Sequence, residues 1–332
     1  MMPQVSVIIP AYNTADYIQQ AIASALNQTL TNLEVIVVDD ASTDGTVEVV
    51  DSIQDPRLRL LVNPVNQGAG GSRNRALAEA RGEWVAILDS DDWYDPQRLE
   101  AMLAVAQGKG ADIVIDDVSF VQDGSTTPWS TLIRESGVSI DGVREVKAPE
   151  FVRSDVEGRR GMRLGFSKPL IKRQILLDHG IAYDKSLRVA EDFWFALECL
   201  ICGAHLYLMP TPYYFYRTRA GSLSDGSQGK KLQRLTESCK KMRAFMAQTS
   251  RAKLGPELWA ALQHKLSVTQ SYRDYYRVVT PMKAGQWQKA LGALLRSPMP
   301  FLNRLFSQVP AIFHRRYEQL FQRSSLTHER MS

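Results

Sequence analysis

Cysteine is scarce in this sequence, and its few copies are poorly spaced for a structural role. There are three in 332 residues: Cys199 and Cys202 share one apolar stretch, and Cys239 stands apart. A structural zinc site needs a second pair of ligands near the first, and a disulfide framework needs more paired cysteines than these. Both classes are excluded, so we expect all three to be buried core thiols.

Long hydrophobic runs are also missing. The most apolar stretch, residues 193–209, contains Glu198 and His205 and is too short to cross a bilayer. It predicts a buried helix followed by a strand. The amino end leads directly into an apolar strand, so we expect no cleavable signal peptide. These absences favour a cytoplasmic protein, either free or peripheral on the inner face of the cytoplasmic membrane.

The first half of the chain does contain an alternation of apolar strands and amphipathic helices. The predicted strands cover residues 5–9, 33–38, 58–62 and 84–88, and the predicted helices lie near 15–28, 44–54 and 70–81. Apolar strands that alternate with helices are typical of an α/β fold, with a mostly parallel sheet flanked by helices on both faces. Ligands of such sheets bind at the carboxyl ends of the strands.

Three acidic residues, Asp89, Asp91 and Asp92, directly follow the fourth predicted strand. Two unit charges about 4 Å apart repel by roughly 4 kcal/mol at an effective dielectric constant near 20, so the cluster needs a cation. Mg2+ and Mn2+ prefer oxygen ligands, and Mg2+ typically combines one or two carboxylates with phosphate oxygens. The pattern predicts a metal that holds a diphosphate. The alternative is a solvated acidic turn that opens a helix near residue 95.

A glycine-rich segment at residues 68–71 does not match either of two common phosphate-binding motifs. The sixth position of a dinucleotide fingerprint would fall on Arg73, and no P-loop lysine follows. We expect Gly68 and its neighbours to let the backbone turn into a helix that begins near Ser72, close to a bound nucleotide.

Four motifs, taken in order, resemble a known family. They are VSVIIPAYN at 5–13, VVDDASTDG at 37–45, NQG at 66–68 with SRN at 72–74, and DSDD at 89–92. This set resembles family 2 glycosyltransferases of the GT-A fold, over about residues 4–225. The resemblance implies a Rossmann-type sheet, a nucleotide-sugar donor and inversion of the anomeric configuration.

The resemblance also implies the residues of the donor site. They are Pro10, Ala11, Tyr12, Asn13, Asp39, Asp40, Gly68, Arg73 and Asp89 for the nucleotide-sugar, with Asp91 and Asp92 for Mg2+ or Mn2+. In this scheme Tyr12 packs on the base, Asp40 reads the edge of the uracil ring, and Asp89 contacts the ribose.

Two physical arguments accompany these roles. Stacking on an aromatic ring stabilises a base by about 1 to 3 kcal/mol. A carboxylate can accept from the ring N–H of uracil or guanine but not in the same way from adenine. A UDP-sugar is therefore the expected donor. The alternative for Tyr12 is a half-buried aromatic residue at the start of the first helix.

A second acidic pair, Glu191 and Asp192, precedes a strongly apolar helix. By resemblance Asp192 is the general base, since an acceptor hydroxyl must lose its proton as it attacks. The alternative is that both acids only favour the amino end of the helix through its dipole. Further on, Arg217 and Arg219 are candidates to pair with a donor phosphate; the alternative is a surface loop with solvated arginines.

Charge separates the chain into two unlike parts. Residues 225–332 contain 19 Lys and Arg against 6 Asp and Glu, whereas the rest contains 21 against 30. We predict a catalytic domain at 1–225 and a basic helical appendage at 226–332, with a last helix at about 300–323. The apolar stripe and arginines of that helix fit an anionic membrane surface and fit packing on the first domain equally well. No nucleic-acid-binding motif is present, so no such partner is expected.

These observations together predict a metal-dependent inverting glycosyltransferase. It would move a sugar from a nucleotide-sugar to a hydroxyl of a glycan or lipid-linked saccharide in polysaccharide biosynthesis. A metal-dependent nucleotidyltransferase would also use clustered aspartates, but it would release pyrophosphate and would not need Asp192. A noncatalytic nucleotide-sugar or membrane-binding scaffold would tolerate Asp192→Asn without loss of its function.

Overall fold

The computed structural model describes residues 2–158, 161–187, 190–219, 228–296, 298–299 and 301–302. The chain divides into two compact units, residues 1–225 with 249–262 and residues 226–248 with 263–332. The segment 249–262 groups with the first unit although it lies in the predicted appendage. The proposed division into 1–225 and 226–332 therefore stays a prediction.

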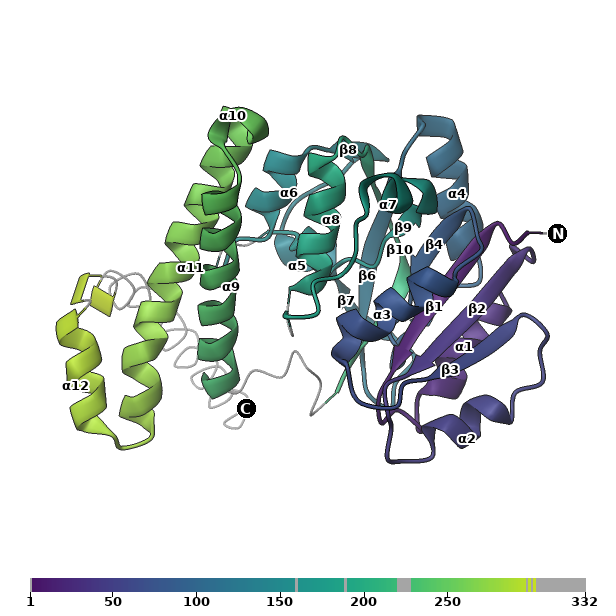
Figure 1. The fold of residues 1–332 in the computed structure, drawn as a ribbon, viewed down its shortest axis with the longest axis horizontal. Helices are drawn as coiled ribbons and strands as arrows, with labels where there is room; N and C mark the ends of the chain where they lie inside the picture. Colours follow the sequence, from purple (N-terminus) through teal and green to yellow (C-terminus); the bar gives the residue numbers. More distant parts are fainter. Residues whose placement is uncertain are drawn as a thin grey trace, which may run out of the picture. The chain divides into compact units, whose positions relative to one another are not determined.

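A ten-stranded sheet forms the centre of the first unit (Figure 1). Its strands are β1 (Val5–Ala11), β2 (Leu33–Asp39), β3 (Leu58–Val62), β4 (Trp84–Ile87), β5 (Trp93–Tyr94), β6 (Ile113–Gln122), β7 (Pro128–Thr131), β8 (Arg144–Val146), β9 (Leu170–Lys172) and β10 (Leu206–Thr218). Their order is β3-β2-β1-β4-β9-β6-β10-β5, with β7 paired to β6 and β8 to β10. Strands β3, β2, β1 and β4 are parallel, and so are β6 and β10. The predicted α/β fold with a mostly parallel sheet is confirmed.

Two short antiparallel strands position the residues that follow β4. Strand β9 lies between β4 and β6 and is antiparallel to both, with Leu170 opposite Ala86. The residues just before β9 therefore lie beside the carboxyl end of β4. Strand β5 is antiparallel to β10, with Tyr94 opposite Tyr214. The residues just before β5 therefore lie beside those that follow Tyr214.

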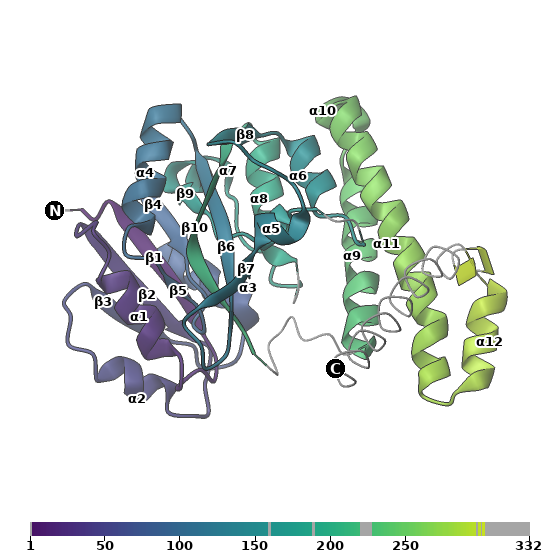
Figure 2. The same ribbon diagram turned by 180° about the vertical axis from the view of Figure 1, so that it is seen from behind.

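Helices cover both faces of the sheet because the strands are apolar on both sides. Val5, Val7 and Ile9 of β1 pack with α1 (Ile18–Leu26), α2 (Thr46–Asp51) and α4 (Arg98–Lys109). Ile8 points to the opposite face and packs with α3 (Gly68–Glu79). Helix α3 covers the face seen in Figure 1, and α1 covers the face seen in Figure 2.

The remaining helices of the first unit are short. They are α5 (Leu132–Ser136), α6 (Ala148–Ser154), α7 (Arg173–His179), α8 (Glu191–Ile201) and α10 (Arg251–Leu254). The predicted buried helix followed by a strand at 193–209 is confirmed by α8 and β10. Cys199 is buried in α8, as expected, and Cys239 is buried too. Cys202 is exposed because it caps the carboxyl end of α8, so its assignment to the core was wrong.

The first four helices start at residues other than those predicted; α1 begins at Ile18 rather than near residue 15, and α2 at Thr46 rather than near residue 44. Helix α3 begins at Gly68 rather than near Ser72, because the backbone N–H groups of Gln67 and Gly68 already donate to the Asp40 carboxylate. Helix α4 begins at Arg98 rather than near residue 95. Asp95 instead shapes the preceding turn, where its Oδ1 accepts a hydrogen bond from the Gln97 N–H.

The second unit is helical in the described residues. It contains α9 (Gln228–Gln248), the part of α11 (Pro256–Lys283) from residue 263, and α12 (Trp287–Arg296). The predicted helix at about 300–323 lies almost entirely outside the described residues. Over the part of the chain that is described, no helix is long and apolar enough to cross a membrane.

Candidate functional site

The carboxyl ends of β1, β2 and β4 form one edge of the sheet. Ala11 pairs with Asp39 across β1 and β2, and Ile8 pairs with Ile87 across β1 and β4. Pro10 and Ala11 therefore belong to β1 itself and supply backbone to this edge. The Tyr12 side chain just beyond them is 49% exposed, which leaves its ring available to a ligand.

The loops that leave β1 and β2 support each other in a strained conformation. Asn13 and Ala41 both have positive φ, 52° and 61°, which is unfavourable for residues other than glycine. The Asn13 N–H donates to Oγ of Ser42 at 3.0 Å, and Asn13 Oδ1 accepts from the Thr43 N–H at 2.8 Å. These hydrogen bonds fix the backbone that directly follows Tyr12.

The two aspartates at the end of β2 have separate tasks. Asp40 is buried, and its carboxylate accepts from Asn63 Nδ2 and from the backbone N–H groups of Gln67 and Gly68, each at 2.8 Å. It thereby orders the turn into α3. Oδ2 of Asp39 accepts from the Ser42 N–H at 3.0 Å, while its buried Oδ1 has no hydrogen-bond partner among the described residues.

Asp92 is tied to β10, as the antiparallel register predicts. Its carboxylate accepts from the Tyr214 hydroxyl at 2.7 Å and from the Arg217 N–H at 2.8 Å. Burial raises the pKa of Asp92 well above its usual value, and the nearby Asp91 and Asp89 carboxylates add to this, against the opposite effect of both hydrogen bonds. Asp92 is therefore mainly a support for the acidic turn.

Asp91 is the more accessible member of the turn. Its side chain is 20% exposed, and its Oδ2 accepts from Nε of Arg219 at 2.8 Å. Arg217 is committed elsewhere: its guanidinium donates to the Asp91 carbonyl at 2.9 Å and to Oε1 of Gln20 at 2.6 Å. Of the two predicted phosphate partners, Arg219 is therefore better placed than Arg217 to exchange its protein contact for a ligand.

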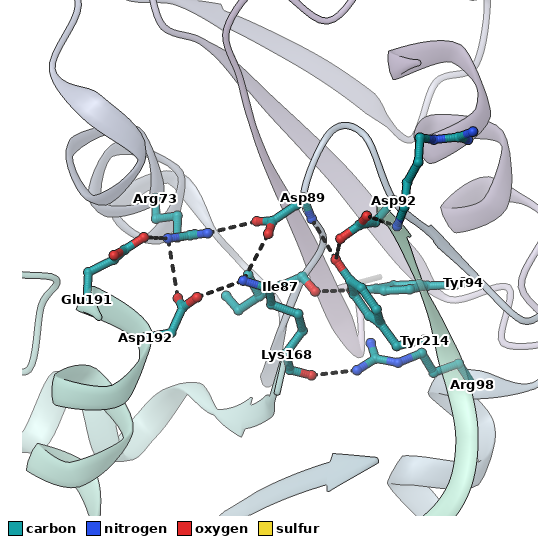
Figure 3. Close-up of polar contacts among 11 residues, drawn as sticks. Arg73, Ile87, Asp89, Asp92, Tyr94, Arg98, Lys168, Glu191, Asp192 and Tyr214 are labelled. Carbon is teal, nitrogen blue, oxygen red and sulfur yellow. Dashed lines mark hydrogen bonds and ion pairs between the residues drawn. The ribbon is translucent and has the colours of Figure 1, made fainter. Parts of the chain in front are cut away.

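Five charged side chains form what we call the central ion cluster: Arg73, Lys168, Asp89, Glu191 and Asp192 (Figure 3). Arg73 donates to Oδ1 of Asp89 at 2.7 Å and to Oε1 of Glu191 at 2.9 Å, and it lies 3.3 Å from Oδ1 of Asp192. Nζ of Lys168 lies 2.9 Å from Oδ2 of Asp89 and 2.7 Å from Oδ2 of Asp192. The cluster thus joins the acidic turn after β4 to the start of α8.

Opposite charges in this cluster favour the ionised forms of Asp89 and Lys168. Burial alone would raise the pKa of Asp89, but Lys168 and Arg73 outweigh it and hold that pKa well below its usual range. Burial would likewise lower the pKa of Lys168, yet Asp192 and Asp89 raise it. Within the described residues, Oδ1 of Asp192 accepts no hydrogen bond although it is buried. This atom therefore has lone pairs that no hydrogen bond uses, although the Arg73 guanidinium lies 3.3 Å from it.

A buried ion pair outside the central ion cluster, Arg98 with Asp116, holds the backbone of Lys168. Arg98 donates to both carboxylate oxygens of Asp116, at 2.9 and 2.8 Å, and to the Lys168 carbonyl at 2.5 Å. Both side chains are fully buried. Arg98 also lies 4.2 Å from the ring centroid of Tyr94. The hydrogen bond from Arg98 to the Lys168 carbonyl fixes the backbone at residue 168, and with it the position of the Lys168 ammonium.

Backbone strain recurs at the entry to α8. Ala190, which caps the helix and precedes Glu191, has φ of 65°. A non-glycine residue in this region costs about 1 to 2 kcal/mol. This backbone conformation sets the direction of the first turn of α8 and so places Asp192 beside Arg73 and Lys168.

Sequence reasoning missed Lys168 and the Arg98–Asp116 pair. The signal for each was a charged residue in or next to an apolar segment, since lysine and arginine are almost never buried unless paired. Lys168 lies two residues before strand β9, and Asp116 interrupts the apolar residues of β6. The structure was needed to show that these isolated charges meet partners.

The acidic turn fits a divalent cation in a limited way. No group of three or more His, Cys, Asp or Glu side chains that could hold a metal occurs in the described ranges. Mg2+ does not require one, since it usually binds one or two carboxylates and takes its other ligands from phosphates and water. Asp91 fits that role because it is partly exposed, whereas both oxygens of Asp92 are engaged with β10.

Comparison with known proteins adds to this geometry. The family model for glycosyl transferase family 2 matches residues 6–178. Succinoglycan biosynthesis protein ExoO of Rhizobium meliloti (strain 1021) is 38% identical over 224 residues. That match covers 67% of this chain and 63% of the relative, so the chain spans less than two thirds of the relative's length.

Two solved structures share the fold at lower sequence identity. Staphylococcus aureus TarS 1–349 in complex with UDP-GlcNAc aligns with a TM-score of 0.56 at 21% identity, over 89% of this chain and 92% of TarS. Mannosyltransferase PcManGT from Pyrobaculum calidifontis, in complex with GDP-Man and Mn2+, gives 0.56 and 21%, over 96% of this chain and 83% of its own. They confirm the predicted GT-A-like architecture.

Proposed function

Because the chain belongs to glycosyl transferase family 2, we propose that it transfers a sugar from a nucleotide-sugar to an acceptor hydroxyl. The donor is a UDP-sugar, and the acceptor is a glycan or lipid-linked saccharide in polysaccharide biosynthesis. The observation that carries this proposal is the central ion cluster. It links the candidate donor edge, at Asp89, to the candidate base, Asp192, through Arg73 and Lys168.

The chain's own residues suit a direct displacement. The exposed Tyr12 ring offers a stacking surface for the base. Lys168 holds Oδ2 of Asp192 and leaves Oδ1 to accept the proton of the attacking hydroxyl. Attack by that hydroxyl on the face opposite the leaving diphosphate would invert the anomeric configuration.

A divalent metal, Mg2+ or Mn2+, is part of the proposal. Asp91 would hold it, with Asp92 ordering the turn from β10. When bound, such an ion would neutralise charge on the departing diphosphate. PcManGT was solved with Mn2+, which supports a metal without deciding between the two ions.

The choice of UDP as the donor nucleotide depends on Asp40. Asp40 already accepts three hydrogen bonds within the protein, two at Oδ1 and one at Oδ2. A carboxylate has about four lone-pair sites, so one remains at Oδ2 for the N–H of a pyrimidine or guanine ring. TarS was solved with UDP-GlcNAc and PcManGT with GDP-Man. Both nucleotides therefore belong in the test.

The acceptor and the cellular site are also proposals. The name of ExoO refers to succinoglycan biosynthesis, which supports a polysaccharide pathway. Saccharides in such pathways can grow on lipid carriers, so we place the chain in the cytoplasm or peripherally on the inner face of the cytoplasmic membrane. No nucleic-acid partner is proposed.

The first test is isothermal titration calorimetry of UDP, GDP and ADP with and without Mn2+. We expect UDP to bind most tightly, with at least a tenfold gain from Mn2+ that Asp91→Asn removes. Leu177→Ser, an exposed substitution in α7, is the control and should match the unmodified chain. Equal, metal-independent binding of all three nucleotides would contradict the donor proposal and leave a noncatalytic scaffold as the better explanation.

The second test separates transfer from other chemistry. With a radiolabelled UDP-sugar and a saccharide acceptor, Asp192→Asn should lower kcat by about a hundredfold or more and leave UDP binding within threefold. Glu191→Gln, which removes a neighbouring charge that also pairs with Arg73, should cost much less. Release of pyrophosphate from a nucleoside triphosphate, in place of UDP from the sugar donor, would identify a nucleotidyltransferase instead.

A further inference from the structure

A row of large apolar side chains is exposed along α12 and the helical residues after it. Trp287 is 65% exposed, Leu291 58%, Leu295 74% and Met299 62%. A spacing of four places these residues on one side of a helix. We call these four residues the α12 stripe. Single exposed apolar residues are common on soluble proteins, but a contiguous row marks a surface that something apolar covers.

A different side of α12, and the residues that follow it, are packed. Ala290 is buried, and Phe301 stacks on Tyr275 of α11 with ring centroids 5.8 Å apart and planes 20° apart. Figures 1 and 2 both show α12 running back beside the end of α11. The stripe residues are exposed, whereas Ala290 of the same helix is buried, so the apolar side chains of the stripe are left without cover.

In the sequence on either side of the stripe, the charged residues have one sign. Residues 275–317 contain seven Lys and Arg and no Asp or Glu. Lys283, at the end of α11, and Lys289 and Arg296, on α12, are all exposed. A surface that covers the stripe therefore meets positive charge at its edges, and an anionic surface is the one that these charges would attract.

We propose that the α12 stripe docks on an anionic lipid bilayer. The apolar side chains enter the boundary between headgroups and acyl chains, and the basic residues remain among the headgroups. Tryptophan is suited to this boundary because its ring is apolar and its N–H is polar. A helix of 10 residues is about 15 Å long, half of the roughly 30 Å hydrocarbon core, so α12 lies in the interface and does not cross it. The stripe contains none of the candidate donor-site residues, so this proposal does not depend on their assignment.

The test is flotation of the full chain with phosphatidylcholine vesicles, with or without 30% phosphatidylglycerol, in the absence of donor and acceptor. We expect binding to the anionic vesicles that weakens in 0.5 M salt and a low partition coefficient on phosphatidylcholine alone. Trp287→Ser with Leu291→Ser and Leu295→Ser should lower the coefficient at least thirtyfold. Lys283→Gln with Lys289→Gln and Arg296→Gln should lower it about a hundredfold, at about fivefold per basic residue.

A matched control carries serine at two exposed apolar positions of the first unit, Leu177 and Val138, which are 55% and 41% exposed. It should bind vesicles as the unmodified chain does. All variants should keep the circular dichroism spectrum and UDP affinity of the parent, which separates loss of docking from loss of fold or donor binding.

Two results would overturn the proposal. One is that the unmodified chain fails to float with anionic vesicles, or that the stripe variant floats equally well. The other comes from sedimentation velocity without lipid: a parent dimer that the stripe substitutions convert to a monomer would identify a second copy of the chain as the cover.

Discussion

Nζ of Lys168 lies 2.7 Å from Oδ2 of Asp192 and is itself almost completely buried. Its removal would leave two carboxylates, Asp89 and Asp192, facing each other with only Arg73 to offset them. We expect Lys168→Met to lower kcat about a hundredfold, with UDP affinity changed much less, because the base loses the contact that orients it. Steady-state kinetics of sugar transfer would measure this effect.

Lys172→Met on β9 is the control, since that lysine is only half-buried, and it should keep normal kcat. Lys168→Arg, which preserves the charge, should recover part of the loss. If Lys168→Met is fully active and folds normally, Lys168 does not position Asp192.

The same charges predict how stability depends on pH. A carboxyl group with a lowered folded-state pKa, such as Asp89, contributes stability that is fully present above its unfolded pKa of about 3.9. That contribution is lost as the pH falls through the lowered value. Lys168 has a raised pKa, so its contribution is present below about pH 10.4 and is lost only as the pH rises toward the raised value.

Melting temperatures from pH 2 to pH 7 would test the acid side. Lys168→Met should flatten the fall in melting temperature at low pH, because the pKa of Asp89 then lies closer to its unfolded value. An unchanged acid profile in this variant would show that Lys168 contributes little to the lowered pKa of Asp89.

The neighbours Asp91 and Asp92 should behave differently when each is changed to asparagine. Asp91→Asn should fold normally and lose metal-dependent UDP binding. Asp92→Asn should destabilise the chain by about 1 to 3 kcal/mol, because asparagine has one acceptor oxygen and either the Tyr214 hydroxyl or the Arg217 N–H then loses its partner. Calorimetry and urea unfolding on the same samples would compare the two, and a reversed pattern would exchange their roles.

The Arg98–Asp116 pair should be costly to break singly. Arg98→Met leaves the Asp116 carboxylate buried without its cation, which typically costs about 3 to 5 kcal/mol of stability. Adding Asp116→Leu should restore a large part of that loss, because neither charge then remains. Urea unfolding of the two single variants and the double variant would give the coupling energy. Additive losses would mean that the pair does not act as a unit.

Ala190→Gly should separate stability from activity. Glycine accepts the positive φ of this position. Relief of strain should therefore raise the free energy of unfolding by about 1 kcal/mol or less, and the melting temperature should rise slightly. It should also loosen the first turn of α8 and lower kcat severalfold. Differential scanning fluorimetry and transfer assays would be compared with Ala41→Gly, which relieves a similar positive φ away from Asp192. A faster enzyme would show that the strain does not help to orient the base.

Local patterns predicted much of the fold. The range 58–62 agrees with β3, and the predicted starts of β1, β2 and β4 agree with the observed ones, because apolar runs bounded by turn residues are local signals. The edge formed by Tyr12, Asp40 and the acidic turn also followed from the sequence, since parallel strands bring their carboxyl ends together. The functional roles of these residues stay predictions.

What sequence could not supply was the contact between distant segments. Strand β9 lies in the sheet between β4 and β6. It has only three residues, which is too short for a periodic pattern to predict a strand there. Its antiparallel direction is what places Lys168 beside Asp89. The surroundings of Cys202 and the contacts of Arg217 depend in the same way on where a helix ends and which strand lies alongside.

The central ion cluster holds two nearly buried cations, Arg73 and Lys168, among three partly buried carboxylates. A substitution at one of these positions should therefore be tolerated only with a compensating substitution at another. A lineage that lost Lys168 alone would carry unbalanced negative charge at the centre of the protein, so we expect descendants to alter Lys168 together with one of its carboxylate partners. Covariation between positions 168, 89 and 192 in related sequences would be the record of that constraint.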